Sequence, residues 1–540
     1  MFRFIYNKLK YYWLINSDME TAGEQGLDQS REEPKDSVLT GNLSADLEII
    51  REIVGTSPDI KVHEFRYGQN SEIKGALVFV DGLVNSTVII DGILKPLKLY
   101  KEFSDYQSQS ITKSLDTVKR TIICAGEITE KHTVGEIVES CLSGDTAFLS
   151  DGFDKALVIS SKGWEKREIT EPQTEAVVRG PREGFTENFR TNTALLRRRI
   201  RSPKLRMENF TIGKKTVTNV CLAYIEGVAD PGIVATARAR LKSIDTDSII
   251  DSGYIEQYIE DNPFSIFPTI GNSEKPDVVA AKVLEGRVAI IVDGSPFVLT
   301  APLLFVESFQ SSEDYYIRPF YASIVRILRH IAFFLTIAAP AIFIALTTFH
   351  QELIPTTLLF TISAAREGTP FPAFLEAFIL ILSFEILREA GVRLPRPVGQ
   401  AISIVGALIM GEAAVSAGLV GAPMVIAIAL TAVAGFVVPE QLDSASIIRI
   451  ILLFLASSLG ALGIAIGLLG VLNHIASLKS FGMPYCAFMT FHHNMQDSYI
   501  RMPLWSMLKR PKGIASGDIT RRAAVKPPPS PTYSSPSGSG

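Results

Sequence analysis

The stretch IAFFLTIAAPAIFIALTTF, residues 331–349, carries no charged side chain. A helix rises about 1.5 Å per residue, so a stretch of this length nearly covers the roughly 30 Å hydrocarbon core of a bilayer. Pro340 lies in the middle, where neighbouring helices or water must satisfy the carbonyl that the proline leaves without a hydrogen bond. The stretch predicts a membrane span, and Pro340 is a candidate for a role in a pathway or in coupling.

A second apolar run, residues 450–472, predicts another span. Four glycines within it recur at three- and four-residue spacing and so share one helical face: Gly460, Gly463, Gly467 and Gly470. Small residues on one face let another helix approach closely. We expect this face to pack against protein rather than lipid.

The region between these two runs is less regular. Residues 401–419 and 424–438 form two apolar segments broken at Gly421-Ala422-Pro423. Residues 353–391 contain an apolar stretch too short to cross, a Gly- and Pro-containing break and then an apolar helix. This pattern predicts a broken or re-entrant hairpin, which survives at membrane depth only where protein or a water-filled cavity shields its backbone.

Three carboxylates lie inside these apolar segments: Glu376, Glu385 and Glu412. An ionisable group in a membrane segment is costly, so a pore, a proton relay or a buried ion pair is the first functional interpretation. A ring of carboxylates would favour cations. Glu385 has a simpler interpretation, because Arg388 and Glu389 follow at helical spacing and the group would then lie at the membrane interface.

The arginines that flank the apolar segments give conflicting signals about topology. Arg326 and Arg329 precede the first span, while Arg388, Arg393 and Arg396 follow the hairpin, and both groups indicate cytoplasmic loops. A hairpin that crosses gives five spans and a basic C-terminal tail outside, whereas one that does not cross gives four. The number of spans, the side of the tail and the helix that lines a pore stay open.

The first 320 residues resemble an ordinary soluble protein, although 20% of the whole chain is charged and mean hydropathy is +0.22. The net charge of −4 argues against a nucleic-acid binder. The four cysteines form no CxxC pair and no metal spacing, so we expect neither a disulfide framework nor a bound metal or cofactor. The N-terminus lacks a signal peptide, which predicts a cytoplasmic soluble part, although residues 1–16 would also suit an amphipathic surface helix.

The soluble part contains what reads as an internal duplication. LVFVDG (77–82) is similar to LAYIEG (222–227), and LSGDTAFLSDG (142–152) is similar to LEGRVAIIVDG (284–294), in the same order and at nearly the same offset. Each copy opens with a β-branched and aromatic strand and closes with a hairpin that has an Asp-Gly turn, and in the second copy a helical pattern lies between them. We therefore predict duplicated α/β or α+β cytoplasmic domains followed by an all-α multi-pass transmembrane domain.

An arginine-rich sequence, GPREGFTENFRTNTALLRRRI (180–200), lies at the junction of the two copies. Such a cluster would bind anionic lipid or an acidic partner, or would form a solvated helix face paired with Glu183 and Glu187. The candidate contact residues in and beside it are Arg179, Arg182, Arg190, Arg197, Arg198 and Arg199.

The composition divides the chain into six predicted parts. These are an N-terminal segment and disordered linker (1–45), the first soluble copy (46–178), the second (179–320), the transmembrane domain (321–475), a juxtamembrane segment (476–507) and a basic, Pro- and Ser-rich disordered tail (508–540).

Several long stretches together resemble the A-subunit family of spore germination receptors of endospore-forming Firmicutes. They include GPREGFTENFRTNTALLRRRI, DSGYIEQYIED, EGRVAIIVDGSPFVLTAP, FEILREAGVRLP and ISIVGALIMGEAAV, and the resemblance covers about residues 45–490. It implies a multi-pass protein of the spore inner membrane that acts with a transporter-like B subunit and a lipoprotein C subunit. It further implies germination triggered by small nutrients, and A subunits that oligomerise into a nutrient-gated ion channel, for which the carboxylates above would favour cations.

Other functions remain open at this point. One is a non-conducting membrane scaffold, and another, within the family, is an accessory role in dipicolinic acid release. A secondary transporter would call for inverted repeats, which we do not find. An enzyme is not expected, because the sequence has no Walker loop, no G-x-G-x-x-G and no G-x-S-x-G motif. The sequence does not identify the nutrient or the number of subunits.

Overall fold

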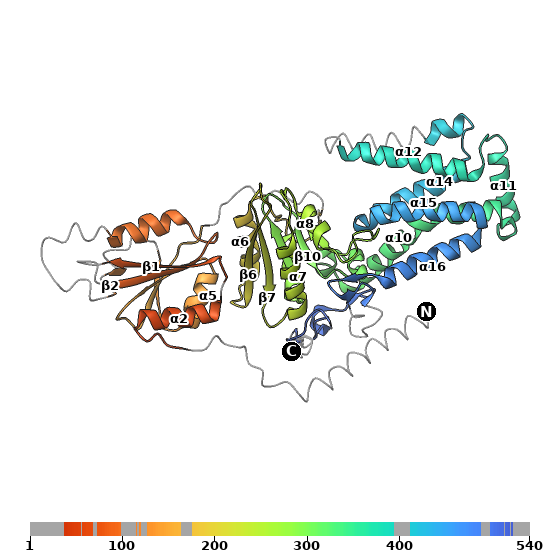
Figure 1. Cartoon of the computed structure of the whole chain (residues 1–540). Helices are drawn as coiled ribbons and strands as arrows, with labels where there is room; N and C mark the ends of the chain where they lie inside the picture. Colours follow the sequence, from red (N-terminus) through yellow and green to blue (C-terminus); the bar gives the residue numbers. More distant parts are fainter. Residues whose placement is uncertain are drawn as a thin grey trace, which may run out of the picture. The chain divides into compact units, whose positions relative to one another are not determined.

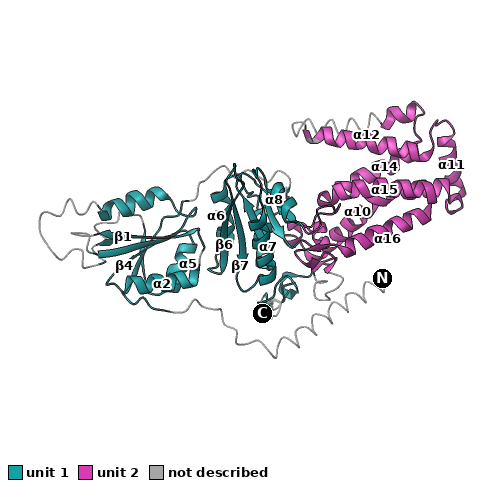
Figure 2. Ribbon diagram, viewed as in Figure 1, with its two compact units in different colours: residues 1–260, 270–302, 502–540 teal, residues 261–269, 303–501 magenta. Residues whose placement is uncertain are grey.

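The structure is a computed structural model of the chain. It describes residues 37–55, 57–67, 73–98, 115, 118–119, 127–163, 175, 177–393, 411–487, 497–511, 513–518 and 520–521. The N-terminal 36 residues, Arg396, the first half of the predicted 401–419 span and the tail beyond 521 therefore lie outside the described residues. The chain forms two compact units, shown in Figure 2: unit 1 (residues 1–260, 270–302 and 502–540) and unit 2 (residues 261–269 and 303–501).

Unit 1 contains two five-stranded antiparallel sheets with corresponding strand orders (Figure 1). The first has the order β1-β2-β4-β5-β3 and the second β6-β7-β9-β10-β8. The strands of the first are β1 (Ile60–Tyr67), β2 (Ile73–Val80), β3 (Ile128–Lys131), β4 (Thr146–Ser150) and β5 (Ala156–Ile159). Those of the second are β6 (Leu205–Ile212), β7 (Thr218–Ile225), β8 (Gly271–Ser273), β9 (Val288–Val292) and β10 (Val298–Ala301). We call the first sheet with its helices repeat 1 and the second repeat 2.

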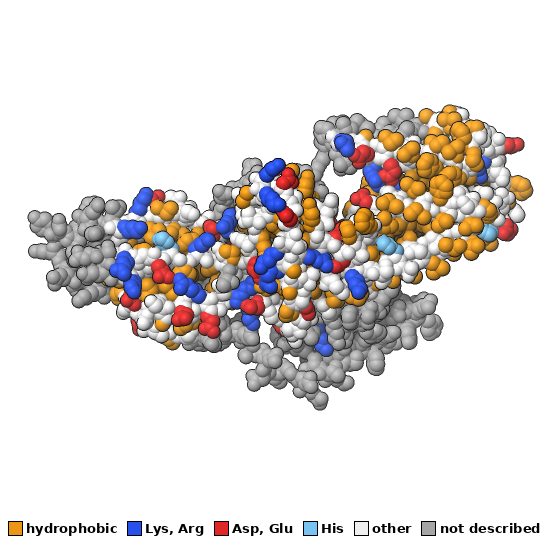
Figure 3. Space-filling view, viewed as in Figure 1, with side chains coloured by type: hydrophobic (Ala, Val, Ile, Leu, Met, Phe, Trp, Pro, Cys, Tyr) orange, Lys and Arg blue, Asp and Glu red, His pale blue; other side chains and the backbone are white. Residues whose placement is uncertain are grey.

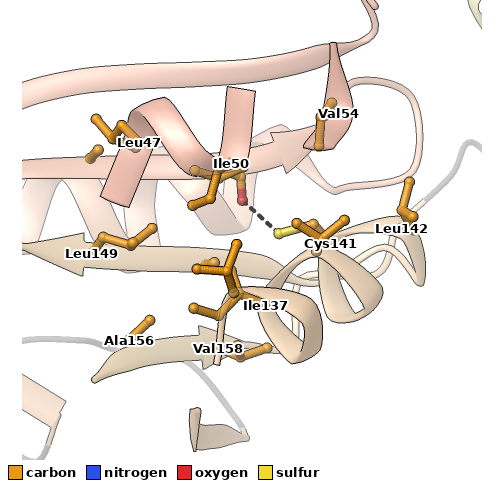
Figure 4. Close-up of a cluster of buried hydrophobic side chains, with 14 of the residues drawn as sticks. Leu47, Ile50, Val54, Ile137, Cys141, Leu142, Leu149, Ala156 and Val158 are labelled. Atoms are coloured by element: carbon orange, nitrogen blue, oxygen red, sulfur yellow. Dashed lines mark hydrogen bonds between the residues drawn. The ribbon is translucent and has the colours of Figure 1, made fainter. Parts of the chain in front are cut away.

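Helices cover these sheets because the strands alternate apolar side chains between two faces. In repeat 1, Ala76 and Val78 of β2 face the helices α2 (Leu43–Val54) and α5 (Val134–Leu142), whereas Leu77 faces a second core that includes η2 (Val88–Leu94). Figure 4 shows the first of these cores, where the Cys141 thiol donates to the Val78 carbonyl at 3.3 Å. Repeat 2 uses α6 (Phe189–Arg199), α7 (Pro231–Ser243), α8 (Ser252–Ile259) and α9 (Pro276–Leu284).

The first helix of each repeat begins with the same capping network. In repeat 1 the Asn42 side chain caps α2, and Asp46 accepts from both the backbone and the hydroxyl of Thr40. In repeat 2, Asn188 caps α6, and the Asn192 side chain accepts from the backbone amide and the hydroxyl of Thr186, as Asp46 does from Thr40. The sequences TGNLSAD (40–46) and TENFRTN (186–192) are thus equivalent, a likeness that strand comparison alone had missed.

The turns of the two repeats also correspond. The similar stretches ending at Gly82 and Gly227 are β2 and β7 with the turns that follow, and these glycines have φ of +89° and +83°. The Asp-Gly turns at Gly152 and Gly294, both at φ +86°, join β4 to β5 and β9 to β10 as antiparallel hairpins. A positive φ at these four turns explains why glycine recurs at each.

Unit 2 consists mainly of helices. They are α10 (Pro319–Thr348), α11 (Thr356–Arg366), α12 (Ala373–Arg393), α14 (Ala422–Gly435), α15 (Leu442–Leu459) and α16 (Ala461–Ser477). Among the described residues, two helical stretches, Pro319–Thr348 and Pro439–Leu459, are long and apolar enough to cross a membrane by length and composition alone. Short 3-10 turns (η5, Phe305–Phe309; η6, Ser312–Tyr315) precede α10.

The predicted single span over residues 450–472 is wrong. The structure divides this run into α15 and α16, with Gly460 between them at φ +61°. The two helices fold back on each other, because Gly463 lies against Leu455 and Gly467 against Leu452. An uninterrupted apolar run conceals such a turn when the turn residue is itself a glycine of the run.

Contacts within unit 2 fix the directions of its helices. The C-terminal end of α10 meets the α15–α16 turn, where the Ala461 amide donates to His350 Nε2 at 3.4 Å. Helix α12 runs antiparallel to α15, since the rings of Phe374 and Phe454 meet edge to face with centroids 5.0 Å apart and Arg449 pairs with Glu385. Helices α10 and α15 therefore run one way, and α12 and α16 run the other.

Candidate functional site

Glu376 lies at a junction of three helix ends in unit 2. Its side chain is fully buried at the start of α12. It accepts hydrogen bonds from the Thr369 hydroxyl at 3.1 Å and from the backbone amide of Gly421 at 3.2 Å, and the Arg366 guanidinium lies 3.5 Å away. Gly421 caps α14, so a single carboxylate joins the end of α11, the start of α12 and the start of α14. This environment matches the buried-pair interpretation of Glu376.

Glu385 links α12 to α15. It forms ion pairs with Arg449 of α15 and, at 2.5 Å, with Arg388 of its own helix. The Ser446 hydroxyl also donates to it at 3.1 Å. Arg449 is 3% exposed, so its charge is neutralised inside the bundle rather than in water. Sequence reasoning missed Arg449, although a lone arginine in the apolar run SASIIRIILL is a signal for such a pair.

Glu412 differs from the other two carboxylates. It lies in the described helical stretch 411–416 and its side chain is exposed, and no ion pair joins it to a described residue. Glu376, Glu385 and Glu412 therefore occupy three separate environments and do not form one cluster in a single chain. Pro340 is buried within α10, which continues through it as a helix.

The four glycines expected on one face have different surroundings. Gly460 is the turn itself, and a Cβ there would lie 2.9 Å from Phe349. Gly463 and Gly467 are buried against α15, where an added Cβ would lie 2.1 Å from the Leu455 carbonyl oxygen or 2.4 Å from Leu452. Gly470 faces open space. Close helix packing thus involves Gly463 and Gly467, and the partner helix is the preceding one.

The arginine-rich junction is used mainly inside unit 1. Arg197 is 1% exposed and makes a bidentate pair with Asp59 of repeat 1, at 2.9 and 3.2 Å. Arg190 lies 3.7 Å from Asp81 of the same repeat. Arg198 and Arg199 pair with Glu183, whose carboxylate is buried rather than on a solvated face.

The acidic partner of this cluster is therefore, in large part, the first repeat of the same chain. Two further hydrogen bonds join the repeats, from Arg206 to the Val54 carbonyl and from Ser57 to the Leu205 carbonyl. Arg179 and Arg182 are exposed, so a lipid or partner contact stays a prediction for these two residues.

A buried ion cluster at the start of α10 was not expected. Arg326 and Asp314 are both fully buried and lie 2.9 Å apart, and Arg326 also contacts Asp497 at 2.8 Å. Arg329 contacts the same Asp314 at 2.8 Å. The two arginines had been assigned to a loop before the span, but α10 begins at Pro319 and includes them. They hold α10 to the segments at 312–315 and 497–498.

The described residues show no group of His, Cys, Asp or Glu that could hold a metal ion. Burial raises the pKa of the Cys141 thiol to about 12 and also raises that of Cys221, so neither thiol is activated as a nucleophile. The described sites are thus ion pairs and helix contacts that position elements of the fold.

Comparisons with known proteins point to one family. Residues 48–513 match the family model described as Bacillus/Clostridium GerA spore germination protein. The chain is 42% identical over 506 residues to "Spore germination protein KA" of Bacillus subtilis (strain 168), which covers 93% of this chain and 91% of the relative. It is 39% identical over 490 residues to "Spore germination protein GerLA" of Bacillus cereus, with 90% and 98% covered.

A solved structure is also similar. It is the crystal structure of the N-terminal domain of the A subunit of the Bacillus megaterium spore germinant receptor GerK3. The sequence identity is 38%, the TM-score is 0.40, and the match covers 50% of this chain and 98% of that one.

Proposed function

The chain belongs to the GerA family of spore germination proteins, and from that membership we propose that it is the A subunit of a nutrient receptor in the spore inner membrane. In this proposal it works with a transporter-like B subunit and a lipoprotein C subunit. Small nutrients trigger germination through the complex, and several copies of the A subunit form a gated cation channel.

The distribution of side chains supports a membrane location for unit 2. Large apolar side chains are exposed along its helices, including Phe360, Ile426, Leu430, Phe454 and Leu469. Figure 3 shows apolar side chains gathered over the helices of unit 2 on the face in view, whereas charged groups are spread over unit 1. Exposed apolar area on this scale marks contact with lipid or with other protein.

The helix directions support a topology in which the two groups of arginines share one side of the membrane. With α15 and α16 as a hairpin, the start of α10, the end of α12 and the end of α16 lie at one end of the bundle. Arg326 and Arg329 near the start of α10, and Arg388 and Arg393 near the end of α12, then share one side. The positive-inside rule makes this side cytoplasmic, as we propose for unit 1.

The exposed Glu412 is the observation that supports conduction. A carboxylate in an apolar segment is costly next to lipid, so it is expected to face water. In a ring of A subunits one such group per copy would line a pore and favour cations. Glu376 is buried against Arg366 and Gly421, so we assign it to holding the helix ends rather than to contact with ions.

Germination of spores that carry single variants tests this division of roles. Glu412→Gln removes the charge with little change in shape, and we expect germination to slow at least tenfold while the amount of receptor stays normal. Glu389→Gln, an exposed carboxylate at the end of α12 paired with Arg393, is the matched control and should germinate normally. Normal germination of the Glu412 variant would reject a pore role and favour a non-conducting scaffold.

A further inference from the structure

A short segment near the C-terminus, residues 513–518, is part of unit 1 and completes the core of repeat 2. Ile514 is fully buried, and Ala515 belongs to the apolar cluster formed by α6, α9 and the second sheet. Ala515 pairs with Ala229, the Ser516 amide donates to the Val228 carbonyl at 3.3 Å and the Asp518 amide to the Gly227 carbonyl at 2.8 Å. The prediction that the whole of 508–540 is a disordered tail is wrong for this segment.

Repeat 1 has an equivalent covering segment, but there the segment follows the strand β5 in the sequence without an intervening unit. Directly after β5, Lys162 pairs with Val84 in an antiparallel bridge, and the Gly163 amide donates to the Leu83 carbonyl at 3.1 Å. These contacts match those of Ala515 with Ala229 and of Ser516 with Val228, position by position.

The glycines nearby follow the same correspondence. A Cβ on Gly144 would lie 3.3 Å from the Lys162 side chain, and one on Gly286 would lie 3.2 Å from the Cα of Ala515. Both glycines have positive φ, at +94° and +105°, in the turn between a helix and a strand. Lys162 and Ala515 thus occupy the same place in two copies of one fold.

We infer that unit 2 is an insertion within repeat 2, and that residues 513–518 are the last segment of that repeat, separated from β10 by the inserted membrane unit. In repeat 1 the chain passes from β5 straight into the covering segment. In repeat 2 it leaves β10 at Ala301, enters unit 2 at Leu303 and comes back to the repeat only after Arg501.

This arrangement has two consequences for the molecule. Both ends of the segment 303–501 are joined to one repeat, so with unit 2 in the membrane as proposed, a repeat 2 on one side of the bilayer requires an even number of crossings, which argues against five spans. A displacement of repeat 2 would also act on unit 2 at its entrance and at its exit together. The small residues of the segment suit this role, because a Cβ on Gly517 would lie 2.1 Å from the Gly227 carbonyl oxygen.

Disulfide cross-linking in the full-length protein tests the inference. Residues paired across an antiparallel bridge have Cα atoms roughly 4.5–5.5 Å apart, within reach of a disulfide. The double variant Ala229→Cys with Ala515→Cys is oxidised in native membranes, and the linked peptides are identified by mass spectrometry. Val84→Cys with Lys162→Cys is the matched pair in repeat 1, and Ser44→Cys with Ala515→Cys is the negative control.

We expect the Ala229–Ala515 pair to cross-link as completely as the Val84–Lys162 pair, and the Ser44 pair to remain unlinked. Adding Gly517→Val should lower the Ala229–Ala515 yield at least fivefold, whereas Ser516→Ala, whose side chain is exposed, should not change it. A missing Ala229–Ala515 link would overturn the inference, whether or not the repeat 1 pair forms. Its failure would leave the proposed channel untouched, since that rests on Glu412.

Discussion

Unit 1 and unit 2 differ in how far they expose their large apolar side chains, although each of them buries an ion pair. In repeat 1 of unit 1, the cores between sheet and helices are apolar, as at Leu47 and Ile137, and one of its ion pairs, between Arg51 and Glu64, is more than half exposed. In unit 2, Arg326 and Asp314 are completely buried, while Leu430 is 50% exposed. The difference fits the membrane location proposed for unit 2: water drives unit 1 to bury its apolar groups, whereas in a bilayer packing and ion pairs would hold unit 2 together.

The largest effect is expected from the buried charges of unit 2. Arg326→Met leaves Asp314 buried with one of its two cations, and removing one partner of a buried pair typically costs about 3–5 kcal/mol. We expect the variant to lose most of the folded full-length protein in detergent extracts. Arg393→Met, which removes an exposed pair with Glu389, is the control and should extract normally. Equal yields of the two variants would show that burial of these charges does not matter.

A matched pair of leucines tests the opposite arrangement of apolar groups. Leu47→Ala empties a site in repeat 1 that is 2% exposed and should destabilise unit 1 by about 2–5 kcal/mol. Leu430→Ala in unit 2 should change stability by less than about 0.5 kcal/mol, because its side chain packs little within the chain. Thermal melting of the full chain, followed by limited proteolysis of each unit, measures both. A larger loss from Leu430 would contradict the lipid-facing assignment.

Glycine substitutions measure how tightly the helices of unit 2 pack. Gly467→Ala would place a Cβ 2.4 Å from Leu452, and overpacking of this kind costs about 1–3 kcal/mol. Gly470→Ala meets nothing within 4 Å and should be neutral or slightly stabilising. Melting of the two variants in the same detergent provides the comparison. If Gly470→Ala is the more harmful, α15 and α16 do not form the described hairpin.

The smallest effect is a pH dependence confined to unit 1. Burial, together with the nearby carboxylates of Glu260 and Asp251, raises the pKa of Glu256 to about 7. A raised carboxyl pKa means that the folded protein holds this proton more tightly, so the stabilisation is complete below about pH 4.5 and is lost as pH rises through 7. The melting temperature of unit 1 should therefore fall as the pH rises from 5 to 8.

In Glu256→Gln that slope should flatten, while Glu52→Gln, on the exposed face of α2, should keep it. An unchanged slope in Glu256→Gln would assign the pH dependence to another group.

The sequence predicted a soluble part and a membrane part because water and a bilayer favour different amino-acid compositions. The repeated strands were visible because β2 and β7, and likewise β4 and β9, keep apolar side chains on both faces. The shared capping residues at Asn42 and Asn188 could also have been found by alignment of the two copies.

Other features depend on contacts between distant segments, which composition does not reveal. The α15–α16 hairpin depends on the conformation of one glycine, Gly460, inside an unbroken apolar run. Some charged residues that the sequence suggests are exposed to water form buried ion pairs instead. These pairs join Arg197 to Asp59, and Arg326 to Asp314 and Asp497. The sequence also does not reveal that residues 513–518 pack on repeat 2, because unit 2 separates them from β10 along the chain.

In the proposed function, the membrane units of several copies of the chain together conduct cations when nutrients reach the receptor. The most direct measurement is potassium release from liposomes that contain the full receptor complex, after addition of a mixture of amino acids and sugars. We expect release from the wild-type complex, and at least tenfold slower release when the A subunit carries Glu412→Gln. A complex that assembles normally but releases no potassium under any nutrient would contradict the claim.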